Sequence, residues 1–321
     1  MTAEKTDRET HAADPRPKAQ VAVRCPLCGA DDYRVKVEDT MGTRVADPRV
    51  HYTCTSSAFG EHGRIVECRS CGLVYMNPRP HHEAVVENYG DVEDREYIEE
   101  EQGRLETFAE SLELVRRYRR SGRLLDVGCH VGTFLTLAEA AGFEVAGVEP
   151  SRWASEIARE RIAGSVHCGA VEDAPLPEGG YDVITLWDVI EHLPDPALDV
   201  RAIHAALRPG GVFAVSTMDV DALFARVAGR RWPWYMQMHL VYFSRRTLCE
   251  MLRREGFQIC EVVTHVRRVR LTYLASRVDA YSPRAGRLAA GLLERAGLAE
   301  RTVGVSLGDI FTVVARKPEA T

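Results

Sequence analysis

The chain has 321 residues, of which 45% are hydrophobic, and its formal net charge is −6. This length accommodates one large domain or two smaller ones, and the composition is that of an ordinary globular protein. The negative charge argues against sequence-independent binding to nucleic acid. The sequence also has no apolar run of about 18 residues that could span a membrane.

Residues 1–20 are polar, contain Pro and Ala, and lack the apolar core of a signal peptide. We expect them to form a disordered tail. The nine cysteines are then expected in a reducing cytoplasm, where paired spacings indicate metal ligands before disulfides.

Two CxxC pairs, each followed by glycine, mark the first folded unit. Their cysteines are Cys25, Cys28, Cys68 and Cys71. Each CxxC turn directs two thiolates to one point, and four thiolates match the tetrahedral preference of zinc. We therefore expect a zinc-ribbon-like domain over 21–80 with a structural Zn²⁺; free cysteines or redox pairs are the alternative. His51, Cys54 or His62, in the loop between the pairs, could replace a ligand.

Residues 81–122 are expected to form a linker and a helical cover. The first part, 81–103, is acidic, and apolar residues then recur at helical spacing. They are Leu105, Phe108, Leu112, Val115 and Tyr118. The pattern predicts an amphipathic helix that ends at Gly122 and packs on the following domain.

From residue 123 the sequence alternates short apolar strands with helical segments. We expect strands at 124–127, 143–148, 166–168, 181–186, 212–216, from 257 and at 310–315, and helices at 133–141, 151–162, 197–207 and 246–255. This rhythm predicts a doubly wound, mainly parallel α/β sheet that binds ligands at the carboxyl ends of its strands. Two insertions, about 219–243 and 267–306, are expected to cover a substrate. The second could also serve as a lid or as the contact of a homodimer.

A strand that ends at Asp126 runs into a turn containing Gly128 and Gly132 and then opens a helix. Such a turn presents free backbone N–H groups and lets a ligand approach closely. An acidic residue before the turn is unusual for a dinucleotide site, because a pyrophosphate is anionic. It suits a ligand with an ammonium group, such as S-adenosylmethionine (SAM). Glu149 ends the second strand, where a carboxylate can accept hydrogen bonds from both ribose hydroxyls.

Five motifs follow one another over residues 124–217: LLDVGCHVGTFL, VEP, VEDAPLP, YDVITLWDVIEHLPDP and LRPGGVFAVST. In this order they resemble the successive motifs of class I SAM-dependent methyltransferases. The resemblance implies a seven-stranded, Rossmann-like methyltransferase domain over 123–321 with SAM as its cofactor. It implies that SAM is held by Asp126, Gly128, His130 and Gly132 at the methionyl end, Glu149 at the ribose, Asp173 at the adenine, and Trp187 and Asp188 beside the sulfonium. His130 stands where the family has a glycine, so it adds a side chain near the methionyl end.

The CPxCG start and the HLxYFS segment extend the resemblance to bacterial methyltransferases of sugars, polysaccharide precursors and natural products. Zinc-bearing deoxysugar C-methyltransferases of this layout carry a His-Glu-His-type segment, which here reads Gln237-Met238-His239. Only the last histidine remains, so His239 is the candidate general base for a hydroxyl acceptor. A buried, loop-ordering histidine is the alternative.

The segment from Asp188 to His192 resembles the metal-binding acidic-x-x-Glu-His segment of ubiquinone-type O-methyltransferases. Mg²⁺ bound there could polarise a catechol-like acceptor. We favour the alternative, a hydrogen-bonded network at the start of a helix, since one such cluster specifies a metal poorly. His192 is the second catalytic candidate.

The sequence therefore predicts a cytoplasmic enzyme that transfers a methyl group from SAM to a small molecule, most simply to a hydroxyl oxygen of a sugar or natural product. Transfer to carbon or nitrogen is the alternative. A SAM-binding protein that uses its zinc ribbon for interaction and does not catalyse is a second hypothesis. A dinucleotide oxidoreductase is a third, and Asp126 argues against it.

Overall fold

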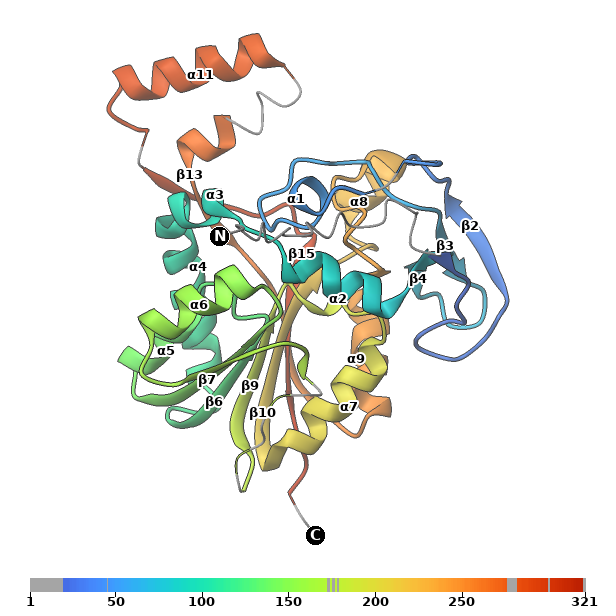
Figure 1. The fold of residues 1–321 in the computed structure, drawn as a ribbon, viewed down its shortest axis with the longest axis vertical. Helices are drawn as coiled ribbons and strands as arrows, with labels where there is room; N and C mark the ends of the chain where they lie inside the picture. Colours follow the sequence, from blue (N-terminus) through green and yellow to red (C-terminus); the bar gives the residue numbers. More distant parts are fainter. Residues whose placement is uncertain are drawn as a thin grey trace, which may run out of the picture.

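The computed structural model describes residues 20–44, 46–171, 174, 177, 179–275, 282–299 and 301–319. Its centre is a seven-stranded sheet (Figure 1). In spatial order the strands are β12 (Gln258–Thr264), β15 (Ile310–Arg316), β10 (Leu207–Met218), β9 (Tyr181–Trp187), β6 (Gly122–Val127), β7 (Phe143–Glu149) and β8 (Ser165–Cys168). Strand β15 is antiparallel to both of its neighbours, and the other pairs are parallel. The predicted mainly parallel, seven-stranded sheet is confirmed.

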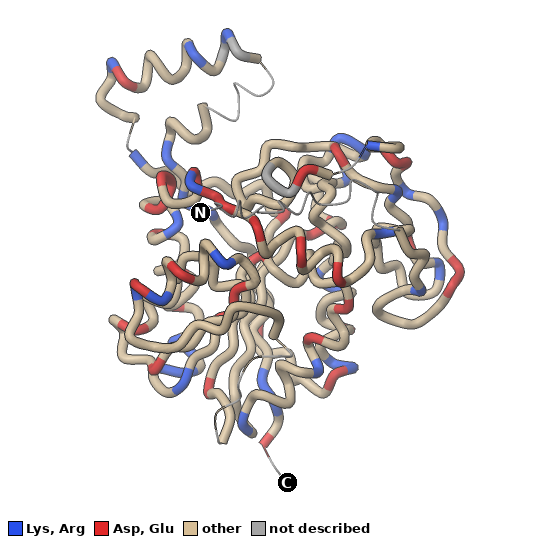
Figure 2. Tube along the Cα trace, viewed as in Figure 1, with Lys and Arg blue, Asp and Glu red and all other residues tan. Residues whose placement is uncertain are grey.

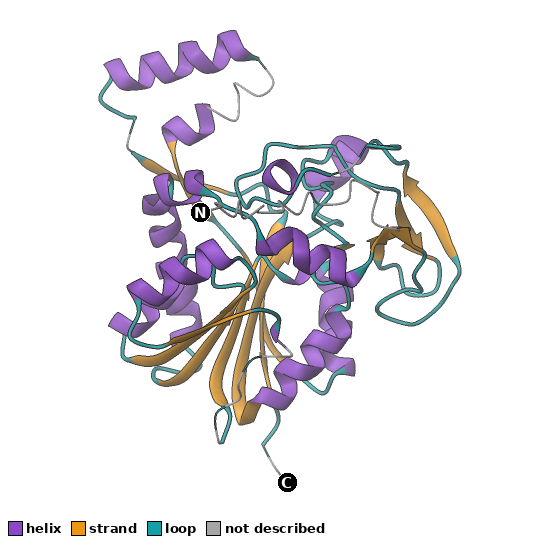
Figure 3. Cartoon of the chain, viewed as in Figure 1, coloured by secondary structure: helices purple, strands orange, loops and turns teal. Residues whose placement is uncertain are grey.

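Helices cover both faces of this sheet (Figures 1 and 3). On one side lie α4 (Glu101–Arg116), α5 (Thr133–Ala140) and α6 (Arg152–Arg161), and on the other lie α7 (Pro196–Ala206) and α9 (Arg245–Arg254). Because successive side chains of a strand point to opposite faces, Leu124 and Leu125 of β6 enter different apolar clusters. The strands are thus buried on both faces, as in a doubly wound fold.

Two boundaries of predicted elements differ from the prediction by five residues or more. Helix α4 ends at Arg116 instead of Gly122, and Tyr118 lies beyond it, where its hydroxyl donates to Glu261. Strand β10 begins at Leu207 instead of residue 212, because Leu207 already pairs with Tyr181 before a shift in register.

The N-terminal cysteines lie beside a second, four-stranded sheet, whose order is β11-β4-β3-β2. Its strands are β11 (Val241–Tyr242), β4 (Val74–Met76), β3 (Ile65–Cys68) and β2 (Tyr33–Val37). Strand β11 comes from the insertion 219–243, so this insertion completes the ribbon sheet in addition to bordering the central sheet. The contact continues along α9, where Arg254 Nη1 donates to the Leu27 carbonyl at 2.8 Å.

In the second insertion, 267–306, the sequence predicts helix after a basic stretch. The insertion begins and ends with two paired antiparallel strands, β13 (Arg267–Arg270) and β14 (Thr302–Val305). Between them, α11 (Pro283–Arg295) projects from the body of the molecule (Figure 1). Helix α11 agrees with the helical part of this prediction, whereas the pairing of residues 267–270 with 302–305 was not predicted.

The remaining elements are short. They are β1 (Gln20–Val21), β5 (Arg79–Pro80), α1 (Pro48–His51), α2 (His82–Gly90), α3 (Arg95–Glu99), η2 (Ile190–His192), α8 (Leu223–Ala228) and η3 (Gly229–Arg231). Gln20 of β1 pairs with Pro80 of β5, and the rest of the expected tail lies outside the described residues. Among the described helices, none combines the length and apolar character needed to cross a membrane. Charges of both signs are spread over the outer elements, and most residues of the central strands are uncharged (Figure 2).

Candidate active site

A cavity of about 320 Å³ opens at the carboxyl ends of the central strands. Its floor includes the ends of β6, β7, β9 and β10, and its cover comes from α2, α3, α4 and β13. This is the crevice at which open α/β sheets bind their ligands, because strand order reverses between β6 and β9. Six of the eight predicted cofactor residues line this cavity, and a seventh, Gly132, is the residue before α5 at the end of the glycine turn. The eighth, Asp173, lies outside the described residues, as does its neighbour Glu172.

Asp126 lies at the end of β6 and is only 2% exposed. It accepts a hydrogen bond of 2.6 Å from the Thr185 hydroxyl on the adjacent strand β9. Burial raises the pKa of Asp126 to about 8, although the Thr185 hydrogen bond acts in the opposite direction. A cationic ligand that reached this carboxyl group would favour its ionised form.

Gly128 and Gly132 have positive φ values of 74° and 77°, which side chains rarely adopt. Space is also restricted at the first position, since a Cβ on Gly128 would lie 2.5 Å from Cγ2 of Val189. Gly132 precedes α5 as its N-terminal cap residue. The turn therefore requires glycine at both positions and brings bare backbone to the cavity.

Glu149 ends β7, is buried, and holds the glycine turn in place. Its carboxylate accepts hydrogen bonds from the N–H groups of His130 at 2.9 Å and Ser151 at 2.8 Å. Burial raises its pKa to about 7, and these two hydrogen bonds lower it in part. A carboxylate has about four acceptor sites, so Glu149 keeps capacity for ribose hydroxyls.

His130 adopts the turn conformation with φ of 50°, although it is not glycine. Its ring packs against Tyr97 of α3, with 3.8 Å between ring centroids, and the guanidinium of Arg104 lies 3.7 Å from the same Tyr97 ring. Burial lowers the pKa of His130 to about 3, so the imidazole is neutral. The extra side chain thus preserves the turn and contacts the cover above it.

Trp187 is the last residue of the central strand β9, and Asp188 follows it. Trp187 packs edge-on against Phe134, with ring centroids 5.2 Å apart. Asp188 accepts from the Ser216 hydroxyl at 2.9 Å and forms an ion pair with Arg267 of β13. Burial alone would raise the pKa of Asp188, but Arg267 and His265 bring it below its ordinary value.

The two catalytic candidates lie side by side in the cavity, with ring centroids 4.8 Å apart. His239 Nδ1 donates to the Trp234 carbonyl at 2.7 Å. Since a carbonyl can only accept, the proton of His239 is on Nδ1 and its Nε2 keeps a lone pair. His192 Nδ1 lies 3.0 Å from the Met238 carbonyl and 2.9 Å from the Tyr89 hydroxyl. Burial lowers the pKa of His239 to about 3 and of His192 to about 4, so both rings are neutral.

The carboxyl group of Glu191 lies close to both histidines. It is fully buried, one carboxyl oxygen accepts from Thr217 at 2.9 Å, and the other has no hydrogen-bond partner among the described residues. One potential ligand atom from each of Glu191, His192 and His239 lies within 4.8 Å of the others. Two imidazoles with one carboxylate do not fit Mg²⁺, which prefers a shell of oxygen ligands, and they suit a transition metal better.

Several residues were given no individual role by the sequence. Those that line the cavity are Tyr89, Tyr97, Arg104, Ser216 and Arg267, and Thr185 contacts Asp126. Thr185 and Ser216 could have been recognised in the sequence, because they are polar residues within otherwise apolar strands. The others lie on segments whose distance from the site depends on tertiary packing, and no local pattern marks them.

The four paired cysteines meet at one point of the ribbon. Sγ of Cys25 lies 3.4 Å from that of Cys71, and Sγ of Cys28 lies 3.5 Å from that of Cys68. All four sulfur atoms are within 4.8 Å of one another. Tetrahedral zinc with bonds of about 2.3 Å places its sulfur ligands about 3.8 Å apart, so this group has the size of a zinc site.

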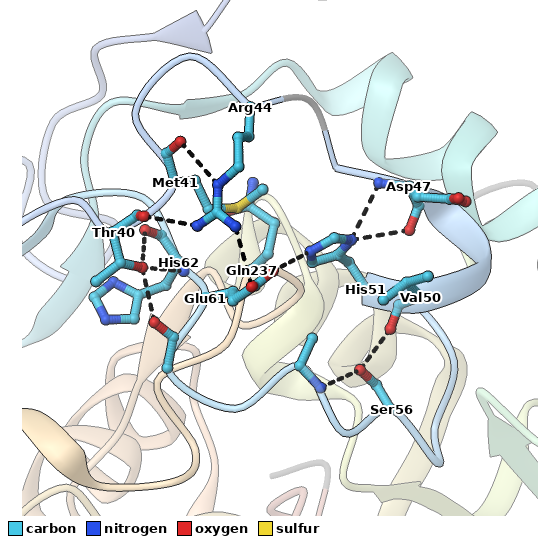
Figure 4. Close-up of polar contacts among 12 residues, drawn as sticks. Thr40, Met41, Arg44, Asp47, Val50, His51, Ser56, Glu61, His62 and Gln237 are labelled. Carbon is cyan, nitrogen blue, oxygen red and sulfur yellow. Dashed lines mark hydrogen bonds and ion pairs between the residues drawn. The ribbon is translucent and has the colours of Figure 1, made fainter. Parts of the chain in front are cut away.

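The alternative ligands in the loop between the pairs are engaged elsewhere. Figure 4 shows His51 between Asp47 and Glu61, with its Nε2 2.9 Å from the Glu61 carboxylate. His62 Nδ1 donates to the neighbouring carbonyl of Gly63 at 2.7 Å. Cys54 belongs to a separate group with Asp94 and His130.

A family model described as a methyltransferase domain matches residues 97–262, more than half of the 321 residues. The chain belongs to this family of methyltransferase domains. With the observed sheet, this confirms the prediction of a class I SAM-dependent methyltransferase.

Curated relatives match the methyltransferase domain over a shorter stretch. The ubiquinone biosynthesis O-methyltransferase of Aromatoleum aromaticum is 36% identical over 103 residues, which are 30% of this chain and 44% of that protein. The protein of the same name from Nitrobacter winogradskyi is 38% identical over 104 residues, covering 30% and 39%. The chain thus spans less than half the length of these relatives. Among solved structures, a SAM-dependent methyltransferase from Mesorhizobium loti is 20% identical, with 66% of this chain and 99% of that chain covered and a TM-score of 0.45.

Proposed function

We propose that this methyltransferase transfers the methyl group of SAM to a hydroxyl oxygen of a small-molecule acceptor. The observation that supports this most is the pair of neutral histidines, His239 and His192, in the cavity that also contains Asp126 and Glu149. The cavity thus combines carboxyl groups suited to SAM with bases suited to a hydroxyl group.

SAM supplies an electrophilic methyl group on a sulfonium. In the proposed complex, Asp126 and the backbone around Gly128 hold the methionyl end, and Glu149 holds the ribose hydroxyls. The acceptor oxygen bonds to the methyl carbon as the carbon–sulfur bond breaks, which leaves S-adenosylhomocysteine. The hydroxyl proton passes to Nε2 of His239, whose orientation is fixed by the Nδ1 hydrogen bond to Trp234.

The lining of the cavity supports the proposed acceptor class. Trp187, Trp234 and Tyr89 contribute aromatic surfaces to the cavity, and the two histidines can supply polar contacts. Such a lining supports a sugar or a natural product with a hydroxyl group as the acceptor. The names of the curated relatives favour a ring hydroxyl of an aromatic acceptor as the second candidate. Transfer to carbon or nitrogen remains the alternative chemistry.

The experiment incubates the protein with isotopically labelled SAM and a panel of hydroxylated sugars, polyketides and catechols. We expect His239→Ala to lower kcat by about 10²–10⁴-fold, the usual contribution of a general base, with little change in the affinity for S-adenosylhomocysteine. His204→Ala is the matched control, because His204 packs against Phe257 and does not line the cavity. Undiminished turnover by His239→Ala would remove the base assignment, and failure to bind SAM would remove the proposed activity.

We also propose that Cys25, Cys28, Cys68 and Cys71 bind a structural Zn²⁺. The sulfur–sulfur distances of 3.4 and 3.5 Å support this. A four-thiolate site is closed, so its role would be structural. Metal analysis of the purified protein tests it: Cys71→Ser should lose one equivalent of zinc.

A further inference from the structure

A third group of potential metal ligands lies at the edge of the cofactor cavity. It contains Cys54, Asp94 and His130, each of which offers one ligand atom within 4.8 Å of the other two. The three residues come from the long ribbon loop, the start of α3 and the glycine turn. The proposed methyl transfer gives none of these side chains a chemical role.

Two of the three side chains have an atom that can donate a lone pair to a metal. His130 is 9% exposed, and its Nδ1 has no hydrogen-bond partner in the part of the chain that the structure describes. Cys54 is a free cysteine that lines the cavity. A neutral imidazole and a cysteine sulfur are the donors that zinc and similar transition metals prefer.

Asp94 supplies an oriented carboxylate. Its two oxygens accept from the Thr55 hydroxyl at 2.6 Å, the Thr55 N–H at 3.0 Å and the Tyr97 N–H at 3.1 Å. A carboxylate has about four acceptor sites, so one remains. Hydrogen bonds of this kind fix a ligating carboxylate in metal sites, and the contact with Tyr97 likewise limits rotation of the His130 ring.

The spacing is close to that of a coordinated metal. Ligands bound at about 2.0–2.3 Å in a tetrahedron lie about 3.3–3.8 Å apart, so the group has to contract by about 1 Å. Rotation of the Cys54 side chain, which is exposed to the cavity, can supply this contraction. Three protein ligands would leave a fourth position open, as in metal sites that bind an additional ligand.

We propose that Cys54, Asp94 and His130 form a second metal site, separate from the ribbon cysteines, for Zn²⁺ or a similar transition metal. Binding replaces the proton of the Cys54 thiol with a metal–sulfur bond, and the proton passes to solvent. The thiolate and the Asp94 carboxylate then balance the two charges of the ion. The bound metal links the ribbon loop and the cover to the glycine turn.

The test titrates the full-length protein with Co²⁺ after its ribbon has been loaded with zinc. We expect one additional equivalent of Co²⁺ with a thiolate-to-cobalt charge-transfer band. The band should vanish in Cys54→Ser, and the affinity should fall at least about tenfold in His130→Ala and Asp94→Asn. Cys260→Ser, which removes another exposed free cysteine, is the matched control and should keep the band.

The band separates this site from the Glu191–His192–His239 group, which contains no sulfur. One equivalent of ribbon zinc and an unchanged circular dichroism spectrum confirm that each variant is folded. An absent band in the zinc-loaded parent protein, or an unchanged band in Cys54→Ser, would overturn the proposal. The titration contains no SAM, so its outcome does not depend on methyl transfer.

Discussion

At the scale of single residues, the buried acids of the cavity connect cofactor binding to pH. Asp126 has a pKa of about 8 and is therefore mostly protonated at pH 6. Binding a ligand with an ammonium group favours the ionised form, so the proton must leave. The affinity for SAM should rise between pH 6 and pH 8, by up to about tenfold per pH unit where the proton is fully displaced.

Calorimetric titration with SAM at pH 6, 7 and 8 measures this effect. Asp126→Asn should bind more weakly at pH 8 and show a flatter pH dependence, with the remaining slope coming from Glu149, whose pKa is about 7. Asp221→Asn alters an exposed acid outside the cavity and serves as the control. Equal pH slopes for the parent protein and Asp126→Asn would contradict the assignment.

His239 leads to a second prediction at this scale. Burial lowers its pKa to about 3, so its neutral, basic form is present above that pH and is lost only as the pH falls toward it. At saturating SAM and acceptor, kcat should show no titration step near 6.5, the ordinary pKa of histidine. A kcat profile from pH 5 to pH 8 provides the measurement, and a fall below pH 6.5 that follows a single ionisation would count against His239 as a desolvated base.

At the scale of elements, the glycine turn between β6 and α5 is the most constrained segment. Gly128→Ala introduces both a side chain at positive φ and a contact of 2.5 Å with Val189. Gly142→Ala is the matched control, because its φ is +93° but no atom lies within 4 Å of the added Cβ. We expect Gly142→Ala to cost about 1 kcal/mol of the free energy of unfolding and Gly128→Ala to cost clearly more.

Thermal unfolding and titration with S-adenosylhomocysteine measure the two effects separately. Adding Val189→Ala to Gly128→Ala removes the contact and should restore part of both stability and binding. Equal losses for Gly128→Ala and Gly142→Ala would mean that the close approach to Val189 has no energetic consequence.

The elements also show what local sequence can predict. The strands of the central sheet are apolar and buried on both faces, and their positions followed from short apolar runs between helices. Strand β11 has two residues, and β13 pairs with β14 across a long insertion. These pairings depend on contacts between distant segments, which no local pattern encodes. The same limit applies to the site: Asp126 and Glu149 end predicted strands, whereas Arg267 reaches Asp188 from the insertion.

At the scale of the whole molecule, the ribbon and the methyltransferase fold share contacts. Strand β11 joins the ribbon sheet, and Arg246 Nη2 donates to the Cys71 carbonyl at 2.8 Å. His239 is two residues before β11, so the ribbon borders the segment that carries the candidate base. Loss of the ribbon metal should therefore affect both stability and turnover.

Cys71→Ser, which removes one of the four proposed zinc ligands, tests this coupling. We expect the melting temperature to fall by more than about 5 °C, since 1 kcal/mol corresponds to roughly 2–4 °C in a chain of comparable size, and kcat to fall as well. Cys260→Ser should leave both unchanged. An independent ribbon would give a separate low-temperature transition with normal methyl transfer below the second transition.

A structure with bound S-adenosylhomocysteine tests the central claim most directly, namely that the carboxyl ends of β6, β7 and β9 form a SAM site. We predict the amino-acid end of the ligand beside Asp126 and Gly128, the ribose hydroxyls on Glu149, and the sulfur facing the space between Trp187 and His239. A ligand bound in another orientation or elsewhere on the molecule would contradict the claim, as would the absence of binding at saturating concentration.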